Sequence, residues 1–272
     1  MSFLRYPPTE KSRSCRVIGM IHLPPLPGTP SANGSGIANL VEHVETEAAI
    51  YREAGVDAVM IENMHDRPYL KGAVGPEIIS AMTLAAIAVK QEFDGPCGVQ
   101  VLAAANREAL AIAYAAGLDF IRAEGFVFAH VADEGLIESE AGTLLRYRRE
   151  IGAEKVAVLA DIKKKHSSHT LTADIDLAGT AEAAEFFLAD GVIVTGASTG
   201  HAPAEADLSD VRNAVEIPVL VGSGVTADNI SAFASHCDAV IVGSSLKEDG
   251  KWTGILSPEK IRLLLDGLRQ PK

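Results

Sequence analysis

The chain has little cysteine, few aromatic residues and no long apolar segment. Its three cysteines, Cys15, Cys97 and Cys237, are far apart and have no CxxC spacing, which argues against a disulfide framework or a zinc site built on cysteines. The longest apolar-rich stretch, residues 78–89, is too short to span a bilayer. The first 16 residues lack the apolar core of a signal peptide. We therefore expect a cytoplasmic protein that does not insert into membranes.

Basic residues are also scarce. The sequence has 24 Lys and Arg against 36 Asp and Glu, giving a formal net charge of −12. This balance disfavours sequence-independent binding to a phosphate backbone, so we expect no nucleic-acid partner. The 47% hydrophobic and 22% charged content is typical of a globular protein with a large core. A length of 272 residues fits one α/β barrel as well as two smaller domains.

Strand-like and helix-like segments alternate along the whole chain. This alternation is typical of a parallel β-sheet with helical crossovers. Strands dense in Val, Ile and Leu are predicted at residues 16–22, 56–63, 97–102, 118–123, 155–163, 191–195, 217–222 and 238–243. Helices are predicted at residues 37–54, 76–92, 107–116, 139–151, 175–189, 204–215, 227–234 and 258–268, with Thr226 and Ser257 as N-caps of the last two.

Eight strand–helix pairs close most simply into a barrel, although an open doubly wound sheet uses the same alternation. We predict a single (β/α)8 TIM barrel of the phosphate-binding type over residues 16–272, after an N-terminal extension of residues 1–15. In such a barrel the functional residues lie at the carboxyl ends of the strands. Two long connections on that rim, residues 23–36 and 125–138, are candidate lids, and the first is equally compatible with a stiff surface loop.

Two glycine-serine turns follow the last two predicted strands. Glycine lets backbone N–H groups approach an anion, and the start of the next helix adds donors and partial positive charge. In βα barrels these two strand ends commonly bind phosphate. A phosphate site is therefore expected at Gly222, Ser223, Gly224, Gly243 and Ser244, extended by residues after the sixth strand, namely Thr195, Gly196, Thr199 and Gly200.

The second predicted strand ends in an unusually polar segment that begins with Glu62 and Asn63. Glu62 shares its strand face with Ala58 and Met60, but the sequence does not tell which face is inside. Glu62 could act as a general base or bind a metal, and an ordinary ion pair with a lysine or arginine is the alternative. Asn63 is a candidate substrate-binding residue.

The fifth predicted strand ends in a carboxylate and three lysines. A period of two places Asp161, Lys163 and Lys165 on one side and Lys164 on the other. We expect Asp161 to handle protons, and Lys163 to polarise a carbonyl, hold a phosphate or form a Schiff base. Lys164 is expected to face solvent. His166 is a candidate ligand-binding residue with an undecided role.

Further candidates end the first and fourth strands. His22 ends the first strand, and Arg122 either pairs with Glu124 or binds a substrate anion, the ion pair being slightly favoured. Asp133 and Glu134 could join Glu62 or Asp161 in holding Mg²⁺, but scattered carboxylates are more often surface residues. No metal site and no cofactor are therefore expected.

Six segments form an ordered set of motifs: residues 17–30, 62–66, 75–77, 120–122, 161–163 with His166, and 221–226. On these segments the sequence resembles the BtpA family of TIM-barrel proteins, which includes photosystem I biogenesis factors and SgcQ-like relatives linked with sugar utilisation. The resemblance covers nearly the whole chain. The segment after the fourth strand of this chain, residues 123–134, differs from the corresponding segment of photosynthetic members. This difference disfavours a photosystem role.

The leading hypothesis is an enzyme that acts on a small phosphorylated sugar or ribosyl compound by isomerase or lyase chemistry. Glu62 and Asp161 would transfer protons, and Lys163 would polarise the reacting oxygen. The chain could also form a homo-oligomer. The alternative, which the resemblance permits, is a noncatalytic biogenesis or stability factor for a membrane protein complex such as photosystem I.

Overall fold

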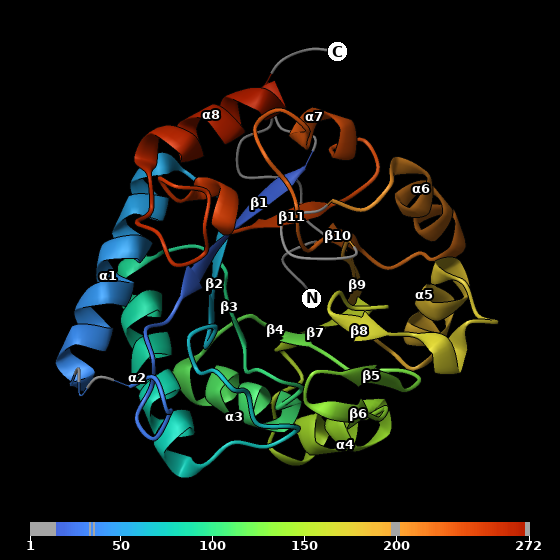
Figure 1. Ribbon diagram of the computed structural model, residues 1–272, viewed down its shortest axis with the longest axis horizontal. Coiled ribbons are helices and arrows are strands. Elements are labelled where there is room, and N and C mark those ends of the chain that lie inside the picture. Colours follow the sequence, from blue (N-terminus) through green and yellow to red (C-terminus); the bar gives the residue numbers. More distant parts are fainter. Residues whose placement is uncertain (1–14, 33, 35, 197–201, 270–272) are drawn as a thin grey trace.

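Eight parallel strands close into a barrel in the computed structural model, which describes residues 15–32, 34, 36–196 and 202–269 (Figure 1). The predicted TIM barrel is confirmed. Around the barrel the strands follow the order β1-β11-β10-β9-β7-β4-β3-β2. Their bounds are β1 (Arg16–His22), β2 (Ala58–Glu62), β3 (Cys97–Gln100), β4 (Phe120–Ala123), β7 (Ala157–Ile162), β9 (Gly191–Val194), β10 (Val219–Val221) and β11 (Ala239–Val242).

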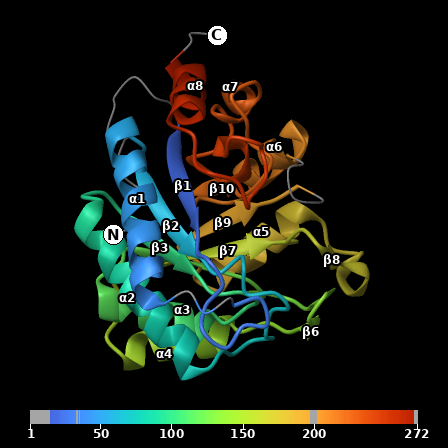
Figure 2. The same cartoon turned by 60° about the vertical axis from the view of Figure 1, so that its left-hand side comes forward.

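Helices form a ring around the outside of the strands (Figures 1 and 2). No helix within the described ranges is both long enough and apolar enough to cross a bilayer. The helices are α1 (Ile37–Ala54), α2 (Pro76–Glu92), α3 (Asn106–Ala116), α4 (Ala141–Glu150), α5 (Leu177–Phe186), α6 (Glu205–Ala214), α7 (Ile230–Phe233) and α8 (Pro258–Arg269).

Helix α7 is shorter than predicted, and Thr226 is not its N-cap. The helix begins at Ile230, with Asn229 in the N-cap position. The Asn229 side chain accepts a hydrogen bond from the Thr226 N–H at 2.8 Å and donates one to the Gly224 carbonyl at 2.9 Å. These bonds hold the preceding residues in a turn. At α8 the prediction was better, because the Ser257 Oγ accepts a hydrogen bond from the Lys260 N–H at 3.4 Å.

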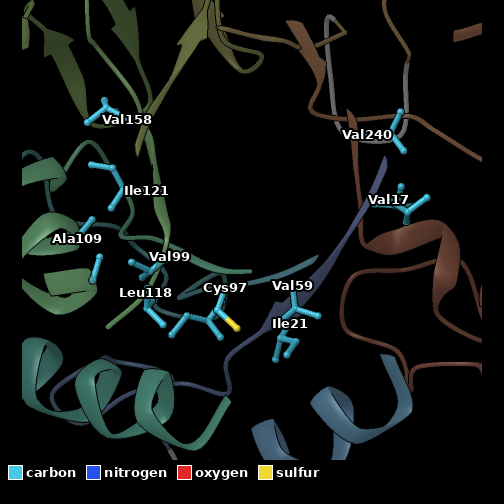
Figure 3. Packing of buried hydrophobic residues seen from close by; sticks show 14 of the residues in the cluster. Val17, Ile21, Val59, Cys97, Val99, Ala109, Leu118, Ile121, Val158 and Val240 are labelled. Carbon is cyan, nitrogen blue, oxygen red and sulfur yellow. The ribbon is translucent and has the colours of Figure 1, made fainter. Parts of the chain in front are cut away.

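Buried side chains form two layers on either side of the barrel wall. The outer layer packs the strands against the helices, with Val17, Val59 and Val99 among its members (Figure 3). The inner layer fills the barrel itself and includes Met20, Met60, Phe120, Leu159, Ile193, Leu220 and Ile241. Because Ala58 and Met60 belong to the inner layer, strand alternation also directs Glu62 into the barrel.

A small antiparallel sheet forms beyond the ends of β4 and β7. Its strands are β5 (His130–Ala132), β6 (Gly135–Ile137) and β8 (Ser167–Ser168), in the order β6-β5-β8. The first two form a hairpin inside the long connection 125–138, and β8 comes from the connection after β7. Pairing between the two connections gives this side of the barrel mouth a defined structure, where the sequence predicted only a long loop.

Candidate functional site

One cavity of about 790 Å³ opens at the carboxyl ends of the strands. Residues from the ends of β1, β2, β3, β4, β7, β10 and β11 line it, so it is the mouth of the barrel. Its volume is in the range typical of small-molecule sites. The location agrees with the position of active sites in TIM-barrel enzymes.

The floor of the cavity is a polar layer above the apolar interior. Parallel pairing places the last inward-facing residue of each strand at a similar height, as the register of His22 with Glu62 and of Glu62 with Gln100 illustrates. All the members of this layer are at least 93% buried, yet they face the cavity: His22, Glu62, Gln100, Arg122 and Asp161. The same strand alternation therefore produces both the core and the site.

Arg122 and Asp161 form an ion pair within this layer. The Arg122 Nε lies 3.1 Å from each oxygen of the Asp161 carboxylate, and Nη2 lies 3.0 Å from Oδ2. The predicted pairing of Arg122 with Glu124 is wrong. Glu124 lies beyond the end of β4 and pairs instead with Lys164, at 3.1 Å. Burial raises the pKa of Asp161, whereas the Arg122 contact favours its charged form.

The three lysines after β7 do not alternate as predicted. Lys163 has a φ of 43°, which breaks the strand alternation directly after Ile162. The Lys163 Nζ points away from the barrel mouth and donates to the Thr172 carbonyl at 3.1 Å. Lys165 lines the cavity together with Asp161, as the alternation predicted, and Lys164 lines it as well. The expected exposure of Lys164 is also wrong, because its side chain is only 11% exposed.

Glu62 and His22 lie side by side at the end of the paired strands β1 and β2. The Glu62 Oε2 is 3.7 Å from the His22 Nε2. Burial raises the pKa of Glu62. Burial, helped by the charge of Lys247, lowers the pKa of His22 to about 3, so the imidazole is neutral at physiological pH. A carboxyl group with a raised pKa beside a neutral imidazole is suited to proton transfer.

The two glycine-serine turns both open into this cavity, as Gly222, Gly224, Gly243 and Ser244 all line it. A Cβ at Gly243 would lie 2.9 Å from the His22 Cε1, so only glycine fits there without displacing the imidazole. The chain then enters a short 3₁₀ turn, Ser244–Leu246, whose first hydrogen bond joins the Leu246 N–H to the Gly243 carbonyl. The N–H groups that start such a turn have no acceptor within it and are suited to an anion.

Residues after β9 contact the turn after β10 and the segment after β7. The Gly196 N–H donates to the Ser223 Oγ at 3.1 Å, and the Thr195 Oγ1 accepts from the Lys165 N–H at 3.0 Å. Thr195 and Gly196 were expected to extend the phosphate site, but they are not among the residues that line the cavity. Thr199 and Gly200 lie outside the described residues.

Asn63 and His166 have different environments. Asn63 is 1% exposed and accepts the Leu102 N–H on its Oδ1 at 2.8 Å, while its Nδ2 donates to Asp66 at 3.1 Å. Asn63 therefore joins the connections after β2 and β3 and does not face the cavity. His166 lines the cavity, as its prediction as a ligand-binding residue requires.

Several cavity residues were not singled out from the sequence, above all Trp252. Its ring lies 4.6 Å from the ring of His65, and the Arg67 guanidinium lies 4.9 Å from its centroid. Trp252 is the only tryptophan of the chain, which is the one signal that could have drawn attention to it. Asp133 and Glu134, which the sequence offered as possible Mg²⁺ ligands, line the cavity too. Within the described ranges no three His, Cys, Asp or Glu side chains gather as a metal site would require.

Two relatives are similar over most of their length. An uncharacterised mitochondrial protein of Caenorhabditis elegans is 48% identical over 250 residues, which cover 90% of each chain. The photosystem I biogenesis protein BtpA of Synechocystis is 38% identical over 255 residues, which cover 93% of this chain and 88% of the relative.

Among solved structures, the (S)-3-O-geranylgeranylglyceryl phosphate synthase of Thermoplasma acidophilum, in complex with sn-glycerol-1-phosphate, has a similar fold. The TM-score is 0.62 at 18% identity, with 99% of each chain covered. This likeness concerns the fold alone. The BtpA family model matches residues 13–270, nearly the whole sequence. Together with the Synechocystis relative, this match shows that the chain belongs to the BtpA family.

Proposed function

We propose that the barrel mouth binds a small phosphorylated sugar or ribosyl compound and that the protein is an isomerase or lyase. One observation carries the proposal: the turns 222–224 and 243–245, from the neighbouring strands β10 and β11, open into the same cavity as Glu62 and Lys165. A phosphate held by the turns would place the remainder of the molecule over these two groups. The sn-glycerol-1-phosphate bound by the Thermoplasma synthase is a ligand of the same class.

In this proposal Glu62 is the proton-transferring group. Burial raises its pKa and so favours the protonated carboxyl group, which can donate a proton to a bound molecule and take one back, and the neutral His22 lies 3.7 Å away. Asp161 has a positioning role, because its carboxylate is occupied by Arg122. Lysine chemistry is assigned to the cavity-facing lysines rather than to Lys163, whose amine lies elsewhere.

Calorimetry and thermal unfolding can test the phosphate site with sn-glycerol-1-phosphate and ribose 5-phosphate against glycerol and ribose. The phosphorylated compounds should bind and raise the Tm, since a ligand that binds only the folded state stabilises it. Gly224→Asp should abolish both effects, because it places a carboxylate in the turn. Gly117→Asp is the matched control: both glycines have a positive φ, 73° and 69°, but Gly117 ends α3, away from the cavity.

Binding of glycerol and ribose as strong as that of the phosphorylated compounds would contradict the phosphate site, and so would unchanged binding by Gly224→Asp. The variants should first be compared for folding without ligand. Equal losses of Tm in Gly224→Asp and Gly117→Asp without ligand would show that both variants are destabilised by the same cause, the strain of a side chain at a positive φ.

The 38% identity with the Synechocystis BtpA protein favours a second candidate, a noncatalytic biogenesis factor for a membrane complex. A Synechocystis strain that lacks its own BtpA can separate the two candidates. If this chain restores photosystem I and the double variant Glu62→Gln, Lys165→Met restores it equally well, the barrel is a scaffold. If the chain without substitutions restores photosystem I and the double variant does not, the chemistry of the cavity is required.

A further inference from the structure

Five lysine and arginine side chains line the cavity, and four of them have a well-defined partner. Lys165 is the exception. Within the described ranges no carboxylate oxygen lies within ion-pair distance of its amine. The partners of the others are the Trp252 ring for Arg67, Asp161 for Arg122, Glu124 for Lys164, and the Lys247 carbonyl for Lys260.

Backbone geometry presents Lys165 to the barrel mouth. Lys163, two residues before it, and His166, directly after it, have positive φ values of 43° and 55°, so the chain turns sharply around Lys165. The Lys165 N–H is fixed on the Thr195 Oγ1 at 3.0 Å. The charge of the amine acts on His22 and Glu62, which lie on β1 and β2, on the other side of the barrel from β7. Lys165 lines the same cavity as these two residues, so its side chain lies at the barrel mouth.

We propose that Lys165 is a catalytic nucleophile whose amine forms an imine with the carbonyl carbon of a phosphorylated aldehyde or ketone. This inference deepens the proposed function, on which it rests, by naming the substrate class and the covalent step. Burial and the positive charge of Arg122 lower the pKa of Lys165, so a larger share of the amine is unprotonated and able to attack.

The step balances with the groups present. The unprotonated amine attacks the carbonyl carbon, and a proton moves from nitrogen to oxygen to give a carbinolamine. Glu62, whose pKa burial raises, donates its proton to the carbinolamine hydroxyl, which leaves as water. The nitrogen electron pair closes the C=N bond, leaving a protonated imine and the Glu62 carboxylate. That carboxylate can then remove a proton from the adjacent carbon, as isomerases and carbon–carbon lyases require.

Borohydride trapping tests the covalent step on the full chain. The protein is incubated with dihydroxyacetone phosphate or ribose 5-phosphate and reduced with sodium borohydride, and the modified residue is mapped by mass spectrometry of peptides. We expect an adduct on Lys165 with at least one probe, and none when borohydride is omitted. Lys165→Arg should remove the adduct. Lys163→Arg, the matched control, should retain it, because the Lys163 amine donates to Thr172 outside the cavity.

The outcomes separate this inference from the proposed function. If both probes raise the Tm but leave no adduct on Lys165, or modify another lysine instead, the nucleophile proposal is overturned and phosphate binding stands. An equal yield of Lys165 adduct with unphosphorylated dihydroxyacetone supports the nucleophile and contradicts the phosphate site. If the probes produce no Tm shift and no adduct, both the nucleophile proposal and the phosphate site are overturned. The adduct is mapped on the chain without substitutions, so this result does not depend on the folding of any variant.

Discussion

Arg122 and Asp161 join the neighbouring strands β4 and β7 through a buried pair in which Nε contacts both carboxylate oxygens at 3.1 Å. The side chains are 6% and 1% exposed. A charge that loses its partner at such a depth is strongly destabilising, because it stays largely desolvated without the contact that compensated for its burial. The pair is therefore a structural element of the barrel as well as part of the cavity floor.

Replacing Arg122 by methionine should lower the free energy of unfolding by about 3–5 kcal/mol, since the Asp161 carboxylate remains buried without its guanidinium. Urea denaturation measures the loss. Arg262→Met is the matched control: its pair with Asp266 has the same chemistry but is 63% and 41% exposed, so its loss should cost less than about 1 kcal/mol. Similar losses in the two variants would show that burial of the Arg122 pair contributes nothing.

Gly19→Ala should destabilise the contact between β1 and α1. A Cβ at position 19 would lie 2.5 Å from the Tyr51 Cε1, and the Tyr51 hydroxyl donates to the Met20 carbonyl at 2.9 Å. The ring must move, so the free energy of unfolding should fall by about 1–3 kcal/mol. Gly36→Ala is the control, because a Cβ there meets open space. Full stability in Gly19→Ala would show that α1 shifts without cost.

His22 should make the protein less stable in acid. Its folded pKa of about 3 lies below its ordinary value of 6.5, so between these values the unfolded chain binds more protons. The free energy of unfolding therefore falls as the pH drops from 6.5 towards 3, by roughly 1 kcal/mol per pH unit from this residue. His22→Gln should flatten the curve in that window, as measured by urea denaturation at several pH values. An unchanged slope would mean that His22 protonates in the folded protein.

Ligand binding should change the fluorescence of the protein. Trp252 is the only tryptophan and lines the cavity between its contacts with His65 and Arg67, so a molecule in the barrel mouth alters its surroundings. Titration with sn-glycerol-1-phosphate should change the emission in a saturable way, whereas glycerol should not. Trp252→Phe should remove the signal while calorimetry still detects the ligand. Calorimetric binding without any emission change would place the ligand away from Trp252.

Strand hydrophobicity and the repeated βα pattern predicted the barrel because parallel strands buried on both faces must be rich in Val, Ile and Leu. The polar ends of the strands were recognisable for the same reason: Glu62, Arg122 and Asp161 interrupt these apolar runs at their carboxyl ends. The glycine-serine turns after the last two strands were also visible, since glycine is required where Gly243 approaches His22. The sequence by itself determined which strand ends could form a site.

Only the tertiary structure decided which side chains meet there. Alternation predicted Lys163 inside the barrel, but Lys163 itself is left-handed, which ended the alternation directly after β7 and brought Lys164 to Glu124. Arg122 was expected to pair with its sequence neighbour and instead pairs with Asp161, 39 residues away, because neighbouring barrel strands place their inward-facing ends together. A repeating local pattern fixes where strands end, whereas contacts between those ends depend on backbone conformation and register.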